Sequence, residues 1–432
     1  MTRSAASIAI VVLLLVLLFA LDVYATYTVF TAPHPGANDF YSRWKGAQVY
    51  WTQGVDPYSD QATLAIQQGI YGRAARPEDD PGLFAYPFYT VFLLAPIAWL
   101  PYAWAEAIWM VLLEFALIGG VMVYISLMGW RLPGWLLAMT GLWAVVFYHS
   151  ARTILLGQFA GLIFLWTVGT LWALGRRRDV AAGVLLALTT IKPQMSILLV
   201  PALVLWAVGR RRWHFLASFG TAIALLLGAS FVLLPTWLAD FLRQVMQYPS
   251  YTAIGSPVWI LAHYYLPQLG LGLGEGMLTA LEAGLSVLLL VYLLAEWRRL
   301  PAVEAASGAF HWLMGLTLIV TNMFVLRTAT TNFVALYIPL FFSLKAALGR
   351  LRGGHRLLAL FYLLSAIGLW VLFLLTVDVR FEHPIMYLLL PLGLLVAFVL
   401  AKAALQNTSV RAQSAATEAG GVVGEEVSVE LS

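Results

Sequence analysis

The sequence contains no cysteine among its 432 residues, and its charged side chains are few. Without cysteine, the chain has no disulfide bonds, thiolate metal ligands or thiol nucleophiles. Charged residues make up only 11% of the chain, against roughly 25% in soluble domains, whereas 61% of the residues are hydrophobic. Such a chain would expose large apolar patches in water. We therefore predict an all-α integral membrane protein.

Two motifs of sugar-nucleotide chemistry are also missing. No Asp-x-Asp pair occurs, and no Gly-x-Gly-x-x-Gly opens a helix. We therefore expect no cytoplasmic sugar-nucleotide donor, no cofactor and no metal. The net charge is only +4, and the arginines lie in short clusters between apolar runs, so nucleic acid is not an expected partner.

The apolar runs predict many membrane spans, because about 20 apolar residues are needed to cross a bilayer. Residues 1–404 are predicted to form a bundle of about 12 transmembrane helices, and residues 405–432 a disordered cytoplasmic tail. Two further stretches, 86–100 and 257–268, are expected to be short re-entrant or interfacial helices. The runs lie at about 8–31, 102–128, 133–150, 157–175, 180–191, 194–209, 213–235, 276–297, 306–326, 330–347, 357–377 and 384–402.

The Lys/Arg clusters predict the orientation of these spans. Most basic clusters fall on one side, which is the cytoplasmic side by the positive-inside rule. The first run lacks a small-residue cleavage site, so we interpret it as an anchor. The opposite side then carries one long loop, 32–85, of about 54 residues. We expect a multi-pass protein of the cytoplasmic membrane whose working face is extracytoplasmic.

Within this loop, Asp39 precedes a segment with helical spacing. Tyr41, Trp44 and Gln48 recur at intervals of three and four, which predicts a short amphipathic helix. Asp39 would be its N-cap, or a catalytic base at the membrane surface, and the two roles are compatible. The acidic run 78–80 is interpreted as a solvated loop in preference to a divalent-cation site.

Several short motifs, in this order, carry a resemblance to a known family. Asn38-Asp39-Phe40-Tyr41-x-x-Trp44 follows the first run, and Gly54-Val55-Asp56-Pro57-Tyr58 and Tyr86-Pro87-Phe88 come next. Together with Gly157-Gln158 and Ile191-Lys192-Pro193, they resemble glycosyltransferase family 87. These are membrane mannosyltransferases of the GT-C class that use polyprenyl-phosphate sugars, among them the mycobacterial phosphatidylinositol-mannoside enzymes.

The resemblance implies a GT-C helical bundle that transfers a hexose, with mannose favoured, to a lipid or glycan acceptor among membrane lipids. Asp39 would deprotonate the acceptor hydroxyl. Because phosphate is a good leaving group, one base would suffice, and the reaction would invert the anomeric centre in a single displacement. Candidate ligands of the donor phosphate are Arg327, Lys192 and Arg152, and candidate substrate-binding residues are Tyr41, Trp44, Gln158, His263 and His383.

Other interpretations remain open at this point. Arg327 could simply extend to lipid headgroups, Lys192 could be a helix-turn charge, and the histidines could be structural. Asp22, Glu114 and Glu282 fall inside predicted spans. They could form hydrogen bonds within the bundle, which we favour, or line a path in a transporter or flippase of lipid-linked sugars.

Overall fold

The computed structural model describes residues 3–34, 36, 38–251, 255–325, 328–349, 351–378, 382–400 and 402. Over these residues the chain is all-helical and contains no strand. Each predicted apolar run contains a helix. These are α1 (Arg3–Thr26), α5 (Tyr102–Leu127), α6 (Gly134–Val146), α8 (Ala160–Gly175), α9 (Asp179–Thr189), α11 (Leu199–Gly209), α12 (Trp213–Leu233), α16 (Glu275–Trp297), α17 (Gly308–Phe324), α18 (Tyr337–Leu348), α19 (Gly354–Thr376) and the segment Pro384–Leu400.

Six of the described helical segments are long and apolar enough to cross a membrane, or seven if one bent pair counts as a span. They are Ser7–Thr31, Tyr102–Leu127, Trp213–Leu233, Glu275–Ala302, Thr330–Leu348 and Gly354–Thr376. The predicted count of about 12 is not confirmed. Five further apolar helices have only 10–17 residues, whereas a straight span needs about 20.

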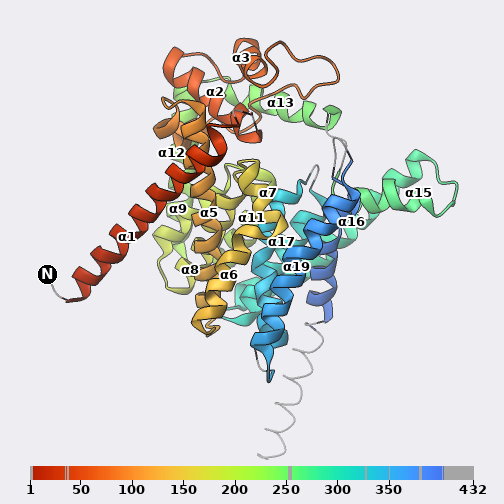
Figure 1. Ribbon diagram of the computed structural model, residues 1–432. Coiled ribbons are helices and arrows are strands. Elements are labelled where there is room, and N and C mark those ends of the chain that lie inside the picture. Colours follow the sequence, from red (N-terminus) through yellow and green to blue (C-terminus); the bar gives the residue numbers. More distant parts are fainter. Residues whose placement is uncertain are drawn as a thin grey trace, which may run out of the picture.

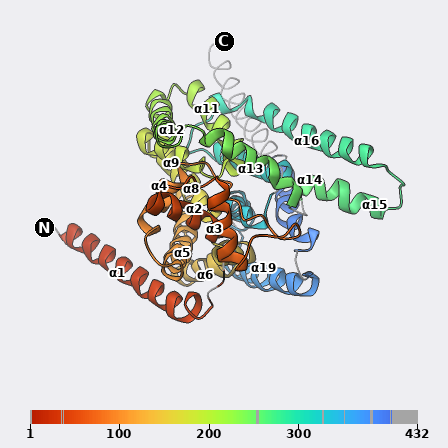
Figure 2. The same ribbon diagram turned by 90° about the horizontal axis from the view of Figure 1, so that it is seen from above.

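The helices differ in how deeply they lie in the bundle. α17 lies at its centre, and nearly all its side chains are buried. α1, α12, α16 and α19 lie outside and expose rows of Leu, Val and Ile, as expected for surfaces in contact with lipid. Figure 2 shows α1 and α16 on opposite sides of the molecule.

A layer of short helices covers one end of the bundle (Figure 1). It consists of α2 (Asp39–Gln53), α3 (Asp60–Tyr71), α4 (Thr90–Leu94), η2 (Ala95–Ile97) and α13 (Trp237–Tyr251). The predicted outer loop is therefore a folded unit. Trp51 Nε1 donates to Val91 O at 2.8 Å, and Ala85 N donates to Gln244 Oε1 of α13 at 2.8 Å.

The two stretches expected to be short interfacial or re-entrant helices are indeed short helices. Residues 86–100 contain α4 and η2, and residues 257–268 contain α14 (Pro257–Ile260), η3 (Leu261–Tyr265) and α15 (Leu266–Gln268). The predicted tail, 405–432, lies outside the described residues.

Candidate active site

The start of α2 differs in one residue from the prediction. Asn38, not Asp39, is the N-cap: its backbone is extended, and its Oδ1 accepts a hydrogen bond from Phe40 N at 3.0 Å. Asp39 is the first helical residue, so its carboxylate is not used as a cap and its side chain is exposed. The negative charge still lies at a helix N-terminus, where the helix dipole stabilises it.

Asn38 also ties α2 to the bundle. Its Nδ2 donates to Glu106 Oε1 of α5 and to Leu155 O, both at 2.9 Å. Its Oδ1 also accepts from Tyr102 OH at 2.9 Å. Because these contacts fix the residue next to Asp39, the position of Asp39 depends on buried groups of α5.

Asp39 belongs to a hydrogen-bonded chain with two other predicted site residues. Gln158 Nε2 donates to Asp39 Oδ2 at 2.6 Å, and Lys192 Nζ donates to Gln158 Oε1 at 2.8 Å. The three residues come from α2, from the α7–α8 bend and from the connection between α9 and α10 (Pro193–Ser196). Since an amide has one donating and one accepting end, Gln158 is oriented by both neighbours.

The bend that carries Gln158 requires glycine. α7 (Tyr148–Leu155) and α8 meet at 119°, and Gly157 between them has a φ of +62°. A Cβ at Gly157 would lie 2.5 Å from Phe40 Cβ, so α2 packs directly on its backbone. Gly157 O accepts from Trp109 Nε1 at 2.8 Å, which fixes the same turn to α5.

Two cations lie near Asp39. Lys192 is 4% exposed and lies in a helix connection, outside the membrane-spanning helices. The pKa of Lys192 is lowered to about 7, mainly by burial and also by the Arg43 guanidinium, while the Asp39 carboxylate opposes the shift. Lys192 has three donors, so donors remain for an anionic substrate group beside its contact with Gln158.

Arg43 was not among the predicted site residues. Its Nη1 donates to Asp39 O at 2.8 Å and to Ser42 Oγ at 2.6 Å, and its guanidinium lies over the Tyr86 ring at 5.0 Å from the centroid. The sequence did contain a signal for Arg43: it follows Asp39 by four residues on a predicted helix, and residues at that spacing share a helix face.

The aromatic residues proposed for substrate binding have packing roles. Trp44 is 3% exposed, and its Nε1 donates to Ile97 O at 3.1 Å, so it packs inside the outer layer. A role of Trp44 in substrate binding stays a prediction. Tyr41 is half-buried, lies edge-on to Tyr102 at 4.7 Å and covers Gly69 of α3.

Arg152 lies in a second polar cluster. Its Nη2 lies 2.7 Å from Glu382 Oε1, and the buried Glu382 carboxylate also accepts from Tyr148 OH at 2.6 Å and from Thr330 Oγ1 at 2.8 Å. The charge of Arg152 is thus already balanced, and a phosphate would have to compete with Glu382. Arg327 lies outside the described residues.

The two predicted histidines lie away from the Asp39 chain. His263 stacks on Trp259, and its Nε2 lies 3.1 Å from Glu282 Oε2. His383 caps η6 (Pro384–Tyr387): its Nδ1 accepts from Ile385 N at 3.2 Å. These contacts fit the structural interpretation of both histidines.

The other acidic residues are also engaged. Asp22 of α1 is hydrogen-bonded to Glu114 of α5, as the favoured interpretation of these residues predicts. In the acidic run, Asp79 lies 2.7 Å from Arg73 Nη1. In the part of the chain that the structure describes, no three acidic or histidine side chains are grouped to hold a metal ion.

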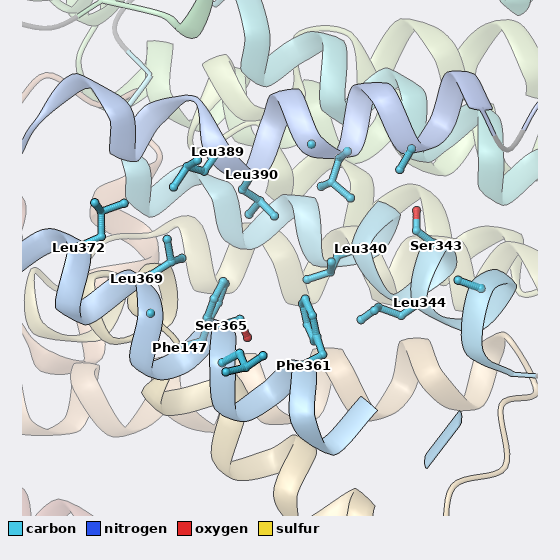
Figure 3. A pocket seen from close by; sticks show the side chains of 16 residues that line it. Phe147, Leu340, Ser343, Leu344, Phe361, Ser365, Leu369, Leu372, Leu389 and Leu390 are labelled. Atoms are coloured by element: carbon cyan, nitrogen blue, oxygen red, sulfur yellow. The ribbon is translucent and has the colours of Figure 1, made fainter. Parts of the chain in front are cut away.

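An apolar cavity of about 550 Å³ lies elsewhere in the bundle, between α18, α19 and the segment Pro384–Leu400 (Figure 3). Phe147, Phe361 and leucines line it, with Ser343 and Ser365 as its hydroxyls. Such a lining suits a hydrocarbon chain better than a sugar, and none of the predicted site residues is part of it.

The fold and the site define a class: a multi-span helical membrane protein with a carboxylate and two cations where a folded outer layer meets the bundle. Comparison with known families identifies the class more closely. The family model of glycosyltransferase family 87 matches residues 84–326, more than half of the chain. The chain belongs to this family and is a membrane glycosyltransferase.

The matched range includes Gln158 and Lys192, whereas Asp39 precedes it. Comparisons with curated proteins and with solved structures found no match.

Proposed function

We propose that the protein transfers a hexose, with mannose favoured, from a polyprenyl-phosphate donor to a lipid or glycan acceptor. The reaction takes place on the extracytoplasmic face of the cytoplasmic membrane. One observation carries the proposal: Asp39, Gln158 and Lys192, from three distant segments, form one hydrogen-bonded chain. In this chain, one end of the Gln158 amide contacts an exposed carboxylate and the other end contacts a buried ammonium group.

In the proposed reaction, Asp39 takes the proton of an acceptor hydroxyl while that oxygen attacks the anomeric carbon. The bond between the anomeric carbon and the phosphate oxygen breaks, and polyprenyl phosphate leaves with the bonding electrons. Lys192, with Arg43 nearby, stabilises the phosphate charge. Because the leaving group needs no proton, no second carboxylic acid is required, and a single displacement inverts the anomeric centre.

The transport alternative gains no support from the arrangement of the intramembrane carboxyls. A path needs charges at several depths on facing helices. Asp22 and Glu114 contact each other, and Glu282 contacts His263. α1 and α16, which carry Asp22 and Glu282, lie on opposite sides of the molecule (Figure 2).

The experiment incubates purified protein with radiolabelled polyprenyl-phosphate mannose and a lipid extract of the host, with and without EDTA. We expect label in a new glycolipid or glycan, at the same rate with EDTA. Polyprenyl-phosphate glucose in a parallel arm tests the sugar. Tight donor binding without a glycosidic product would contradict the proposal and favour transport.

A further inference from the structure

A seven-residue pattern, Trp-Ala-x-Gly-Arg-Arg-Arg, occurs twice in the chain. It spans residues 172–178 and 206–212 and ends α8 and α11. α8 begins next to Gln158 and has 16 residues, so its arginine end lies about 24 Å from the Asp39 site at 1.5 Å per residue. These two segments, called the twin turns below, take no part in the proposed reaction.

The twin turns have the same backbone. Arg178 N donates to Ala173 O and Arg212 N donates to Ala207 O, both at 2.8 Å. The middle arginines, Arg177 and Arg211, have φ values of +56° and +53°. This left-handed conformation favours glycine and costs other residues roughly 1–2 kcal/mol. Both turns thus place an arginine where a helix end ordinarily has glycine.

The twin turns are joined to each other. Arg212 Nε lies 2.9 Å from Asp179 Oδ2, just after the first turn, and Arg212 Nη2 donates to Leu174 O at 3.4 Å. Arg210 pairs with Glu304. Among the described residues, the other arginines of the twin turns have no acidic partner within salt-bridge distance, and all are exposed; they are Arg176, Arg177, Arg178 and Arg211.

Two neighbouring cavities open at the twin turns, one beside the first turn and one between the two turns. One, of about 300 Å³, is lined by Arg177, Arg178, Asp179 and His214 together with Val180 and Ala181. The other, of about 320 Å³, shares Arg177 and Asp179 and adds Arg210, Arg212 and Glu304. Cations outnumber carboxylates in both, so an anion is the complementary ligand.

The surface around the cavities is apolar. Val180 is 60% exposed, Val208 48% and Trp213 59%. A ligand that satisfies both the arginines and this rim has an anionic head and hydrocarbon chains. Free phosphate would contact only the arginines and leave the apolar rim uncovered.

We propose that the twin turns bind the phosphate headgroup of an anionic phospholipid, whose acyl chains lie against α9 and α12. Guanidinium groups bind phosphate through paired hydrogen bonds, and basic pockets between membrane helices bind anionic headgroups. The positive-inside rule accounts for arginines on this face. It does not account for left-handed arginines in two joined turns that share one cavity and have a second cavity beside it.

The test uses the full-length protein, delipidated in neutral detergent. Native mass spectrometry measures binding of phosphatidylglycerol, phosphatidylcholine or inorganic phosphate. We compare R177Q/R178Q with the matched variant R352Q/R356Q, which removes two exposed arginines, one from the turn before α19 and one from the first turn of α19. We expect wild type and R352Q/R356Q to bind phosphatidylglycerol at least about tenfold more tightly than phosphatidylcholine, and R177Q/R178Q to lose about tenfold in affinity.

A second variant separates binding from folding. R177G/R211G relieves the left-handed strain, so it should unfold at the same or a higher temperature without lipid and still bind phosphatidylglycerol more weakly. The proposal is overturned if both phospholipids bind equally, if R352Q/R356Q loses as much affinity as R177Q/R178Q, or if inorganic phosphate at equal concentration displaces the lipid.

Discussion

Replacing Gln158 with leucine should separate the base from the buried cation while keeping the side-chain size. Leucine removes the donor to Asp39 Oδ2 and the acceptor for Lys192 Nζ, which lie at 2.6 and 2.8 Å. A hydrogen bond to a charged group contributes about 1.5–3 kcal/mol, which corresponds to about 10- to 150-fold in rate. Because Asp39 is exposed, water replaces part of the lost contact, and we expect kcat to fall about tenfold.

The assay measures initial rates of transfer from polyprenyl-phosphate mannose at several donor concentrations. The donor KM should change less than about threefold, since Lys192 stays in place and loses only a competing acceptor. Gln48→Leu is the matched control, because Gln48 Oε1 accepts from Lys45 Nζ at 2.7 Å on the same α2 helix. Its activity should stay within about twofold of wild type.

Two results would refute this reasoning. Wild-type kcat in Gln158→Leu would mean that the amide does not position the base. An equal loss of kcat in Gln48→Leu would mean that the outer layer is sensitive to any lost Gln–Lys contact.

Three further predictions concern the residues around this chain. Asn38→Ala should lower the free energy of unfolding by about 1–3 kcal/mol, because it removes an N-cap and leaves Glu106 short of a donor. Thermal unfolding in detergent measures this change, and an unchanged unfolding midpoint would contradict the prediction. Gly157→Ala should lower the free energy of unfolding by at least about 2 kcal/mol, because alanine is strained in the left-handed conformation and its Cβ would displace Phe40. Wild-type stability of this variant would show that the bend tolerates a Cβ. The donor KM should rise as pH increases through about 7, because Lys192 has a pKa of about 7 and only its protonated form attracts phosphate. Lys192→Arg should abolish this pH dependence of KM. A pH dependence that persists in Lys192→Arg would assign the titration to another group.

The positions of the helices could be predicted from the sequence, but the number of spans could not. The run 102–128 became α5 (Tyr102–Leu127), and the run 213–235 became α12 (Trp213–Leu233). Hydropathy marks apolar residues, yet it does not show where a helix bends. Around Gly157 the backbone turns by 119°, so α7 and α8 do not form one straight span, and five other apolar helices have only 10–17 residues.

The members of the site could be predicted one at a time, whereas their association could not. Asp39 and Gln158 are 119 residues apart and Gln158 and Lys192 are 34 apart, so only the tertiary fold brings them together. Asn and Asp are equally good N-caps, which is why the sequence could not distinguish Asn38 from Asp39. Likewise, the spacing that placed Trp44 on a helix face could not show that this face is buried.

The most direct test of the central claim is transfer activity of Asp39→Asn beside Asp60→Asn. Asp39 and Asp60 are each the first residue of a helix in the outer layer, behind an N-cap, and both are exposed. The two substitutions are therefore chemically matched. We predict that Asp39→Asn abolishes sugar transfer at wild-type expression and stability, and that Asp60→Asn retains it. Near-normal transfer by Asp39→Asn would contradict the assignment of Asp39 as the base.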